Sequence, residues 1–181
     1  MTFFDRQTFN QDHFAIFGLS RRQALDVEAL ERMYQDLQTR LHPDKHAHLG
    51  ESERRLSMQW ASRVNEGYQI LKSPLSRARY LLELAGAGVD VERNTAMSAE
   101  FLMDQMARRE AVAEAREAGD IDLLDDLARQ ARQNMAEPYR QLMTSLDEQQ
   151  DYQRAAELVR QLLFQEKLLH DIDEAIQAVD A

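Results

Sequence analysis

Two polar residues close together in the sequence, His42 and Asp44, are the side chains best suited to chemistry. A histidine beside a carboxylate can act as an acid–base pair, but a catalytic base also needs a third group that orients it. Pro43 separates the two side chains and no such third group accompanies them, so we expect no enzymatic activity. Asp44 instead offers a carboxylate with which an arginine of a partner protein can form a charge-assisted hydrogen bond.

Three histidines in this region, His42, His46 and His48, also suggest a metal site. Two of them would share a helix face only if a helix ran through Pro43, and proline ends helices. The chain has no cysteine, so it has no thiolate ligand either. We expect at most a weak adventitious metal site, and no cofactor.

Two amphipathic patterns flank this region and would place it at the tip of a helical hairpin. Apolar residues recur at steps of three and four, which puts them on one stripe of each helix. The first stripe is Val27, Leu30, Tyr34, Leu37 and Leu41; the second is Leu56, Trp60, Val64, Tyr68 and Leu71. Such stripes pack as an antiparallel pair with Trp60 buried between the helices, and Pro43 should end the first helix near Leu41.

Capping residues mark where the helices of the first half should begin. Asp12 is suited to cap a short helix over residues 13–17. Asp26 is the natural cap of the first hairpin helix, and Ser52 is the expected cap of the second. Pro74 should end that second helix after Leu71.

Three more helices are expected in the second half, over residues 98–118, 122–146 and 151–179. Pro138 should kink the second of these helices. Apolar residues seven apart predict that the third forms the seam of a bundle: Ala155, Leu162, Leu169 and Ile176. No segment alternates as a strand does, so the predicted fold class is all-α.

A polar stretch rich in glycine divides the chain. Residues 86–97 read as a linker, which gives an amino-terminal domain over 1–85 and a three-helix domain over 98–181. The first 79 residues hold 12 Lys and Arg against 10 Asp and Glu, whereas the remainder holds 10 against 22. This acidic second part disfavours nucleic acid as a partner. No signal-peptide core or membrane span is evident, so a cytoplasmic protein is expected.

The placement of His42-Pro43-Asp44 between two helices, the second carrying Val64-Asn65-Glu66-Gly67-Tyr68, resembles the J-domain. The run from Ser73 to Leu82, Ser-Pro-Leu-Ser-Arg-Ala-Arg-Tyr-Leu-Leu, is similar to the HscB co-chaperones of iron–sulfur cluster assembly, as is Phe101-Leu102-Met103-Asp104-Gln105-Met106. The resemblance therefore covers nearly the whole chain. It implies an amino-terminal J-domain, built as an antiparallel hairpin with accessory helices, followed by a three-helix bundle.

The resemblance also implies roles for particular residues. A tip of this kind docks on a DnaK-type chaperone resembling HscA and stimulates its ATP hydrolysis; the implied chaperone-binding residues are His42, Pro43, Asp44, Lys45, Arg32 and Arg40. The family's second domain binds a cluster scaffold resembling IscU; the implied client-binding residues are Leu102, Met103, Met106, Glu110, Glu114 and Phe164. Ala107 stands where relatives can carry a carboxylate, so one polar contact is expected to be missing.

The residues themselves leave other interpretations open. A stripe such as Leu102, Met103 and Met106 is also what a bundle core looks like. Phe101, Ala111, Val112 and Ala115 can supply the inward contacts instead, which would leave the first three residues partly exposed. The rival functions are a J-domain protein with a different client, a helical adaptor without a chaperone partner, and an enzyme that uses the loop histidines.

Overall fold

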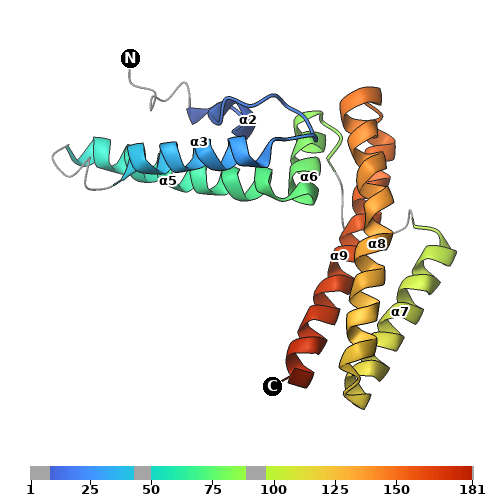
Figure 1. Ribbon diagram of the computed structural model, residues 1–181. Helices are drawn as coiled ribbons and strands as arrows, with labels where there is room; N and C mark the ends of the chain where they lie inside the picture. Colours follow the sequence, from blue (N-terminus) through green and yellow to red (C-terminus); the bar gives the residue numbers. More distant parts are fainter. Residues whose placement is uncertain (1–8, 43–49, 89–96, 181) are drawn as a thin grey trace. The chain divides into compact units, whose positions relative to one another are not determined.

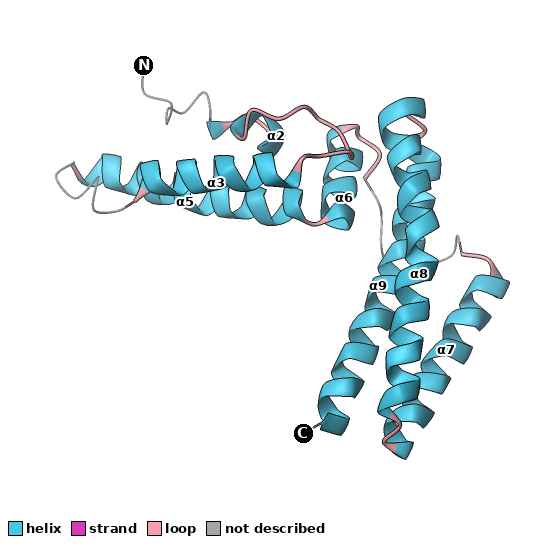
Figure 2. Ribbon diagram, viewed as in Figure 1, coloured by secondary structure: helices cyan, strands magenta, loops and turns pink. Residues whose placement is uncertain are grey.

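In the computed structural model, which describes residues 9–42, 50–88 and 97–180, every regular element is a helix (Figures 1 and 2). This confirms the predicted all-α class. The chain forms two compact units, Met1–Leu81 and Leu82–Ala181. The expected linker over 86–97 stays a prediction, because residues 89–96 lie outside the described ranges. None of the helices in those ranges is long and apolar enough to cross a membrane.

The first unit is built on the predicted hairpin, formed by α3 (Val27–Leu41) and α5 (Glu51–Lys72) (Figure 1). Most of the two apolar stripes lie in its core, and Trp60 is completely buried. Val27 is the exception, since 46% of its surface is exposed. It is the first residue of α3, and the prediction that it lies on the inward stripe was wrong.

The short helix α2 (His13–Ile16) packs on this hairpin. Its Phe14 and Ile16 are buried, as is Phe17 directly after it. The close approach depends on Gly67 of α5: a Cβ atom there would stand 2.7 Å from Nδ1 of His13. Position 67 in the run Val64–Tyr68 is therefore a glycine, because the space that a larger side chain would need is occupied by residues of α2 and its end.

The helix starts follow the predicted caps with one correction. Asp12 accepts a hydrogen bond from the Ala15 amide, and Asp26 accepts one from the Ala29 amide, both at 3.0 Å. Ser52 is not the cap of α5, because Gly50, two residues earlier, takes the capping position and the helix begins at Glu51. The backbone amide of Gly50 donates a hydrogen bond to the Glu53 carboxylate at 3.2 Å, so the third residue of the helix provides the hydrogen-bond acceptor for the capping residue.

Pro74 ends α5 as predicted and begins α6 (Pro74–Leu84). A proline at the first position of a helix sacrifices no hydrogen bond, because that amide would have no helical partner. Side chains fix this junction to the rest of the unit: Gln23 donates to the Pro74 carbonyl at 2.9 Å, and buried Arg77 donates to the Leu71 carbonyl at 2.5 Å. Tyr80 accepts a hydrogen bond from the backbone amide of His13 at 3.0 Å.

The second unit contains the three predicted long helices: α7 (Ala99–Ala118), α8 (Ile121–Thr144) and α9 (Tyr152–Asp180). Ser98 caps α7 through the Phe101 amide, and Gly119 ends it in the left-handed conformation. The second helix ends two residues before its predicted end. A turn of π-helix, η2 (Ser145–Gln149), follows it and leads into the left-handed Gln150.

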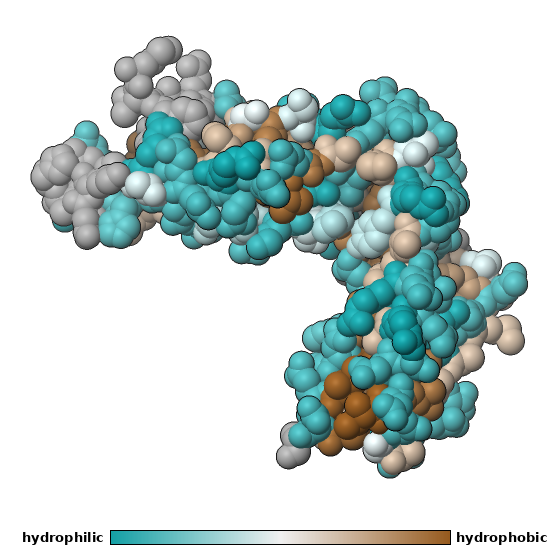
Figure 3. Space-filling view, viewed as in Figure 1, coloured by the Kyte–Doolittle hydropathy of each residue, from teal (hydrophilic) through white to brown (hydrophobic). Residues whose placement is uncertain are grey.

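The bundle core contains the smaller side chains as well as the large ones. Val112 and Ala115 of α7 pack against α8 and α9. On α9, Leu162 is fully buried as predicted, but Leu169 and Ile176 are only partly buried and lie at the edge of the core. Leu168 and Ala175 take the buried positions instead. Figure 3 shows apolar side chains gathered on this unit toward the end of α9.

Candidate functional site

The tip of the hairpin begins at His42, which follows α3 and is exposed. Its backbone turns away from helical dihedrals, with φ −56° and ψ 131°, as expected of a residue before proline. The other three tip residues, Pro43, Asp44 and Lys45, lie outside the described residues, as do His46 and His48. Among the residues that are described, no group of three metal-ligating side chains occurs.

The two arginines expected to accompany the tip are both on the surface of α3. Arg32 lies 3.7 Å from Glu28 and 3.9 Å from Asp26, and Arg40 lies 3.5 Å from Asp36. Exposed ion pairs of this kind contribute little stability, so a partner carboxylate can replace these acidic side chains at small cost. Glu31, which precedes Arg32, accepts a hydrogen bond from Tyr68 across the hairpin.

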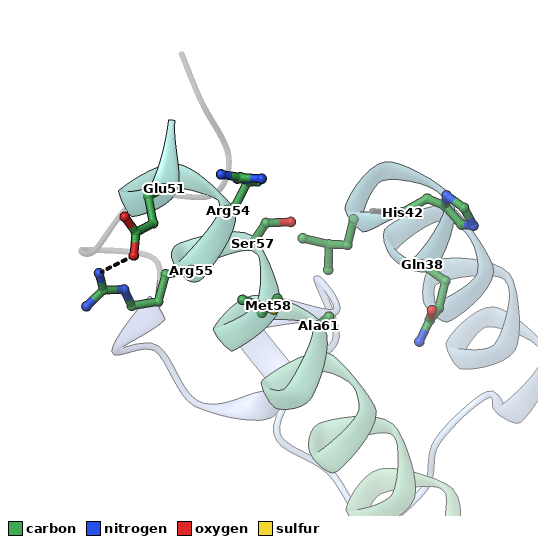
Figure 4. Close-up of a pocket in the computed structure, with 9 residues that line it drawn as sticks. Gln38, His42, Glu51, Arg54, Arg55, Ser57, Met58 and Ala61 are labelled. Carbon is green, nitrogen blue, oxygen red and sulfur yellow. Dashed lines mark ion pairs between the residues drawn. The ribbon is translucent and has the colours of Figure 1, made fainter. Parts of the chain in front are cut away.

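A pocket of about 620 Å³ opens beside His42, between the end of α3 and the beginning of α5 (Figure 4). Leu41, Met58 and Ala61 provide apolar lining, and Arg54 and Arg55 add positive charge. Figure 4 shows Arg55 directed toward Glu51, with which it forms an ion pair at 3.9 Å. Sequence reasoning missed Arg54 and Met58, since they lie off the apolar stripe that identified the helix; 65% of the Met58 surface is exposed.

The expected client-binding residues fall on α7 and α9. Met103 and Met106 are 69% and 71% exposed, Glu110 and Glu114 are exposed, and Leu102 and Phe164 are partly buried. Val112 and Ala115 are buried in the core instead, as expected if Leu102, Met103 and Met106 are not the core stripe of this helix. Exposed methionines are flexible and polarisable, which suits a surface that adapts to another protein.

Phe101 joins the two helices at this surface. Its ring meets that of Phe164 edge to face, with the ring centres 5.9 Å apart. The sequence interpretation gave Phe101 an inward role only, but the side chain is half-buried and links α7 to α9. We call Phe101, Leu102, Met103, Met106 and Phe164 the α7–α9 patch. Ala107 lies next to it and is exposed.

Two polar contacts involve residues that are close to the patch in the sequence. Asp104 accepts a hydrogen bond from Arg108 at 2.8 Å, one helical turn along α7. Tyr139 of α8 donates to Glu166 of α9, two residues after Phe164. Burial and the neighbouring Glu166 carboxylate raise the pKa of Tyr139 far above its ordinary value, so this hydroxyl stays protonated as a donor.

Comparisons with known proteins cover both units. Residues 97–173 match a family model described as the HSCB C-terminal oligomerisation domain. A co-chaperone protein HscB homolog from Azoarcus sp. (strain BH72) is 53% identical over 170 residues, which cover 94% of this chain and 96% of the relative. The HscB homolog from Ralstonia nicotianae is 47% identical, with 93% and 96% covered.

Two solved structures resemble this chain along most of its length. Chaperone HscB from Vibrio cholerae superposes with a TM-score of 0.83 at 30% identity, covering 93% of this chain and 99% of that one. Human co-chaperone protein HscB gives a TM-score of 0.85 at 25% identity, covering 91% and 82%. The likeness therefore includes the hairpin as well as the three-helix bundle.

Proposed function

The chain belongs to the HscB family of co-chaperones, and on this basis we propose that it stimulates ATP hydrolysis by a DnaK-type chaperone resembling HscA and delivers to it an iron–sulfur scaffold resembling IscU. The observation that carries the proposal is the 53% identity spread over 94% of the chain, since it spans both units. The protein acts through its partner's ATPase, without chemistry of its own, in the cytoplasm.

The mechanism is a coupling of two binding events. Holding the scaffold on one unit and the chaperone contact on the other raises the scaffold's effective concentration at the chaperone, to about the millimolar range that short tethers give. Hydrolysis of ATP by the chaperone then traps the scaffold. Stimulation requires that the hairpin tip bind one conformation of the chaperone more tightly than another.

On the hairpin, the chaperone contact consists of the tip and the basic face of α3: His42, Pro43, Asp44, Lys45, Arg32 and Arg40. Two features support this assignment. His42 is exposed at the end of the hairpin, and Arg32 and Arg40 are exposed on α3, where each forms an ion pair with an exposed acidic side chain. The pocket lined by Arg54 and Met58 lies beside His42 and extends the available surface onto α5.

On the bundle, the scaffold contact consists of the α7–α9 patch with Glu110 and Glu114. The strong exposure of Met103 and Met106 and the ring contact between Phe101 and Phe164 support one continuous apolar surface across two helices. Interface energy usually concentrates in a few central apolar or aromatic anchors. The aromatic pair and Leu102 are suited to be those anchors, because they are already partly ordered by packing.

The chaperone assignment is tested by Asp44→Asn, which removes the charge and keeps the size of the side chain. We expect stimulation of the chaperone's ATPase to be abolished while the helical content and melting temperature are unchanged. The matched control is Asp125→Asn, a change of the same chemistry at an exposed position of α8. A folded Asp44→Asn variant that stimulates normally would refute docking through the tip.

The scaffold assignment is tested by combining Leu102→Ala, Met106→Ala and Phe164→Ala. Each truncation should cost about 1–3 kcal/mol of binding, so the scaffold affinity of the combined variant should fall by several orders of magnitude. Titration calorimetry with the purified scaffold measures this affinity, and the melting temperature of each variant is determined separately. Leu123→Ala with Met143→Ala is the control, because these side chains are 43% and 38% exposed elsewhere on the bundle.

The two experiments separate the competing interpretations. Unchanged scaffold affinity in the combined variant would leave a J-domain co-chaperone with a different client. A loss of affinity that only follows unfolding would show that the three residues serve the core. Failure of the Asp44 experiment with a positive scaffold result would instead leave a helical adaptor.

A further inference from the structure

The first turns of α7 carry their polar and apolar residues on unexpected sides. Leu102, Met103 and Met106 are partly or largely exposed, whereas Gln105 is buried, with 5% of its surface exposed. The later turns follow the usual pattern, since Val112 and Ala115 are buried. The part of α7 that carries the patch therefore buries a polar side chain against the bundle, whereas the later turns bury apolar ones.

A pocket of about 130 Å³, partly open to solvent, lies beneath these turns, between all three helices of the bundle. Gln105 and Phe101 of α7 line it together with Asn134 of α8 and Gln165 of α9. Asp104 and Arg108, which are hydrogen-bonded to each other, also line it. Phe101 thus belongs both to this cavity and, through its ring contact with Phe164, to the α7–α9 patch.

Two buried oxygen atoms at this cavity accept no hydrogen bond from the protein. They are the side-chain carbonyl oxygens of Gln105 and Gln165. A buried amide oxygen without a donor costs about 1–3 kcal/mol, so these positions call for a ligand that supplies hydrogens. Arg108 does not meet this need, because its Nε donates to Asp104 and neither glutamine oxygen accepts a hydrogen bond from any side chain.

We propose that this cavity is a water-binding site, and that Gln105 and Gln165 are positioning residues that hold the patch-bearing turns of α7 through the bound water. Water is the ligand that fits both the size and the chemistry. A site for one molecule needs only about 10–15 Å³ of space for its centre together with two to four polar partners. The cavity exceeds that size. Its polar partners for water are the two glutamine oxygens, which lack a donor, together with the Asn134 amide and the Asp104 carboxylate.

The water site acts on client binding through Phe101. Water-mediated hydrogen bonds are nearly as favourable as direct ones and fix the distance between the groups that they join. A bridge from Gln105 to Gln165 would set the spacing between α7 and α9 at the level where Phe101 meets Phe164. The geometry of the α7–α9 patch then depends on two side chains that do not themselves touch the scaffold. This role rests on the proposed scaffold-binding function, whereas the water site itself does not.

A double-mutant cycle on stability tests the water site without any partner. Gln105→Leu and Gln165→Leu each displace water and leave the opposite oxygen unsatisfied, so each should lower the melting temperature by about 5 °C or more. The double variant removes both acceptors and fills the cavity with apolar atoms, and should melt within about 2 °C of the wild type. Gln130→Leu and Gln177→Leu, at exposed positions of α8 and α9, are the control pair and should be additive.

The double-mutant cycle and a crystal structure can each overturn the water site. Additive effects of the two core substitutions would show that no ligand joins the residues. A high-resolution crystal structure of the full chain is the direct measurement, and it should show ordered water within hydrogen-bond distance of both amide oxygens. An empty cavity, or a direct hydrogen bond between the two side chains, would also refute the proposal.

The positioning role is tested with the same stable double variant. We expect its affinity for the scaffold to fall about tenfold, and the methyl NMR signals of Met103 and Met106 to shift, although its melting temperature is nearly that of the wild type. Unchanged affinity and unchanged methyl signals would overturn the positioning role. The Leu102, Met106 and Phe164 experiment distinguishes this result from failure of the proposed function, because that variant must lose affinity if the patch binds the scaffold at all.

Discussion

His13 is an ionisable side chain placed in the apolar core of the first unit. It is 5% exposed, and its ring lies against Tyr80 with the ring centres 4.9 Å apart. Burial is the main cause that lowers the pKa of His13, and the positive charge of Arg63 lowers it further; Glu66 opposes the shift. The folded unit therefore holds a neutral imidazole where an unfolded chain would bind a proton near pH 6.5.

This lowered pKa predicts that the first unit loses stability in mild acid. Below about pH 6.5 the unfolded chain takes up a proton that folded His13 does not, so unfolding becomes more favourable as the pH falls. The loss is at most about 1.4 kcal/mol per pH unit until the folded pKa is reached. Urea titrations of the first unit's transition between pH 7.5 and 5.5 measure it.

His13→Gln is the control for this prediction, since glutamine is polar and does not titrate. Its stability should be lower at neutral pH because packing in the core is disturbed, but the slope between pH 7.5 and 5.5 should be shallower than that of the wild type. Equal slopes in the two proteins would show that His13 contributes nothing to the acid sensitivity.

Sequence reasoning at the scale of residues succeeded where a pattern has one physical cause. Asp12 and Asp26 were identified as caps because their short carboxylates reach backbone amides, and both do so. The prediction of Ser52 as a cap was wrong, because the Glu53 carboxylate accepts the hydrogen bond of the Gly50 backbone amide at the start of the helix instead. Gln105 was not identified as buried, since a glutamine between Asp104 and Met106 carries no sequence signal of burial.

At the scale of elements, the packing of α2 on α5 depends on one missing side chain. Gly67 faces His13 and Phe17, and a Cβ atom would stand 2.7 Å from the imidazole Nδ1 and 3.1 Å from a ring carbon of Phe17. Such distances require that one of these buried rings move. Neither ring has free space, because Phe17 is 1% exposed and His13 is 5% exposed.

Gly67→Ala should therefore destabilise the first unit although alanine favours helices. Alanine gains roughly 1 kcal/mol over glycine inside a helix, and overpacking a core typically costs about 1–3 kcal/mol. We expect a net loss, seen as a lower denaturation midpoint in urea. Gly50→Ala is the control in the same unit, because its Cβ would be 3.8 Å from the nearest side-chain atom. A stabilised Gly67→Ala variant would mean that α2 moves away at no cost.

The elements themselves were predictable because each is an amphipathic helix with a clear beginning or end. The turns between them were less so: the end of α8 passes into the π-helix over Ser145–Gln149, which no local residue signal marked. The α7–α9 patch was predicted by resemblance and its exposed methionines agree with it. Its link through Phe101 was not, because ring contacts between distant helices are set by packing, which periodicity does not specify.

At the scale of the whole molecule, each unit has its own core and its own charge. The hairpin core is built around Trp60, and the bundle core around residues such as Leu124 and Ile172. The first 79 residues are nearly balanced in charge, whereas the remainder holds 22 acidic residues against 10 basic ones. Units with separate cores are able to unfold separately.

Trp60→Ala should make this independence visible. Trp60 is completely buried in the hairpin core, so its truncation should cost about 3–5 kcal/mol, a large share of the stability of a small domain. Calorimetry should show the transition of the first unit shifted to lower temperature or lost, and the transition of the bundle unchanged. Stimulation of the chaperone's ATPase should fall with the first unit, whereas scaffold affinity measured at the same temperature should stay within about twofold of the wild type, because every residue of the α7–α9 patch lies on the other unit. Two outcomes would contradict this prediction. Near-native stability of the Trp60→Ala variant would show that Trp60 does not contribute to the hairpin core. A joint loss of both transitions, with scaffold affinity falling in parallel, would show that the two cores unfold as one cooperative structure.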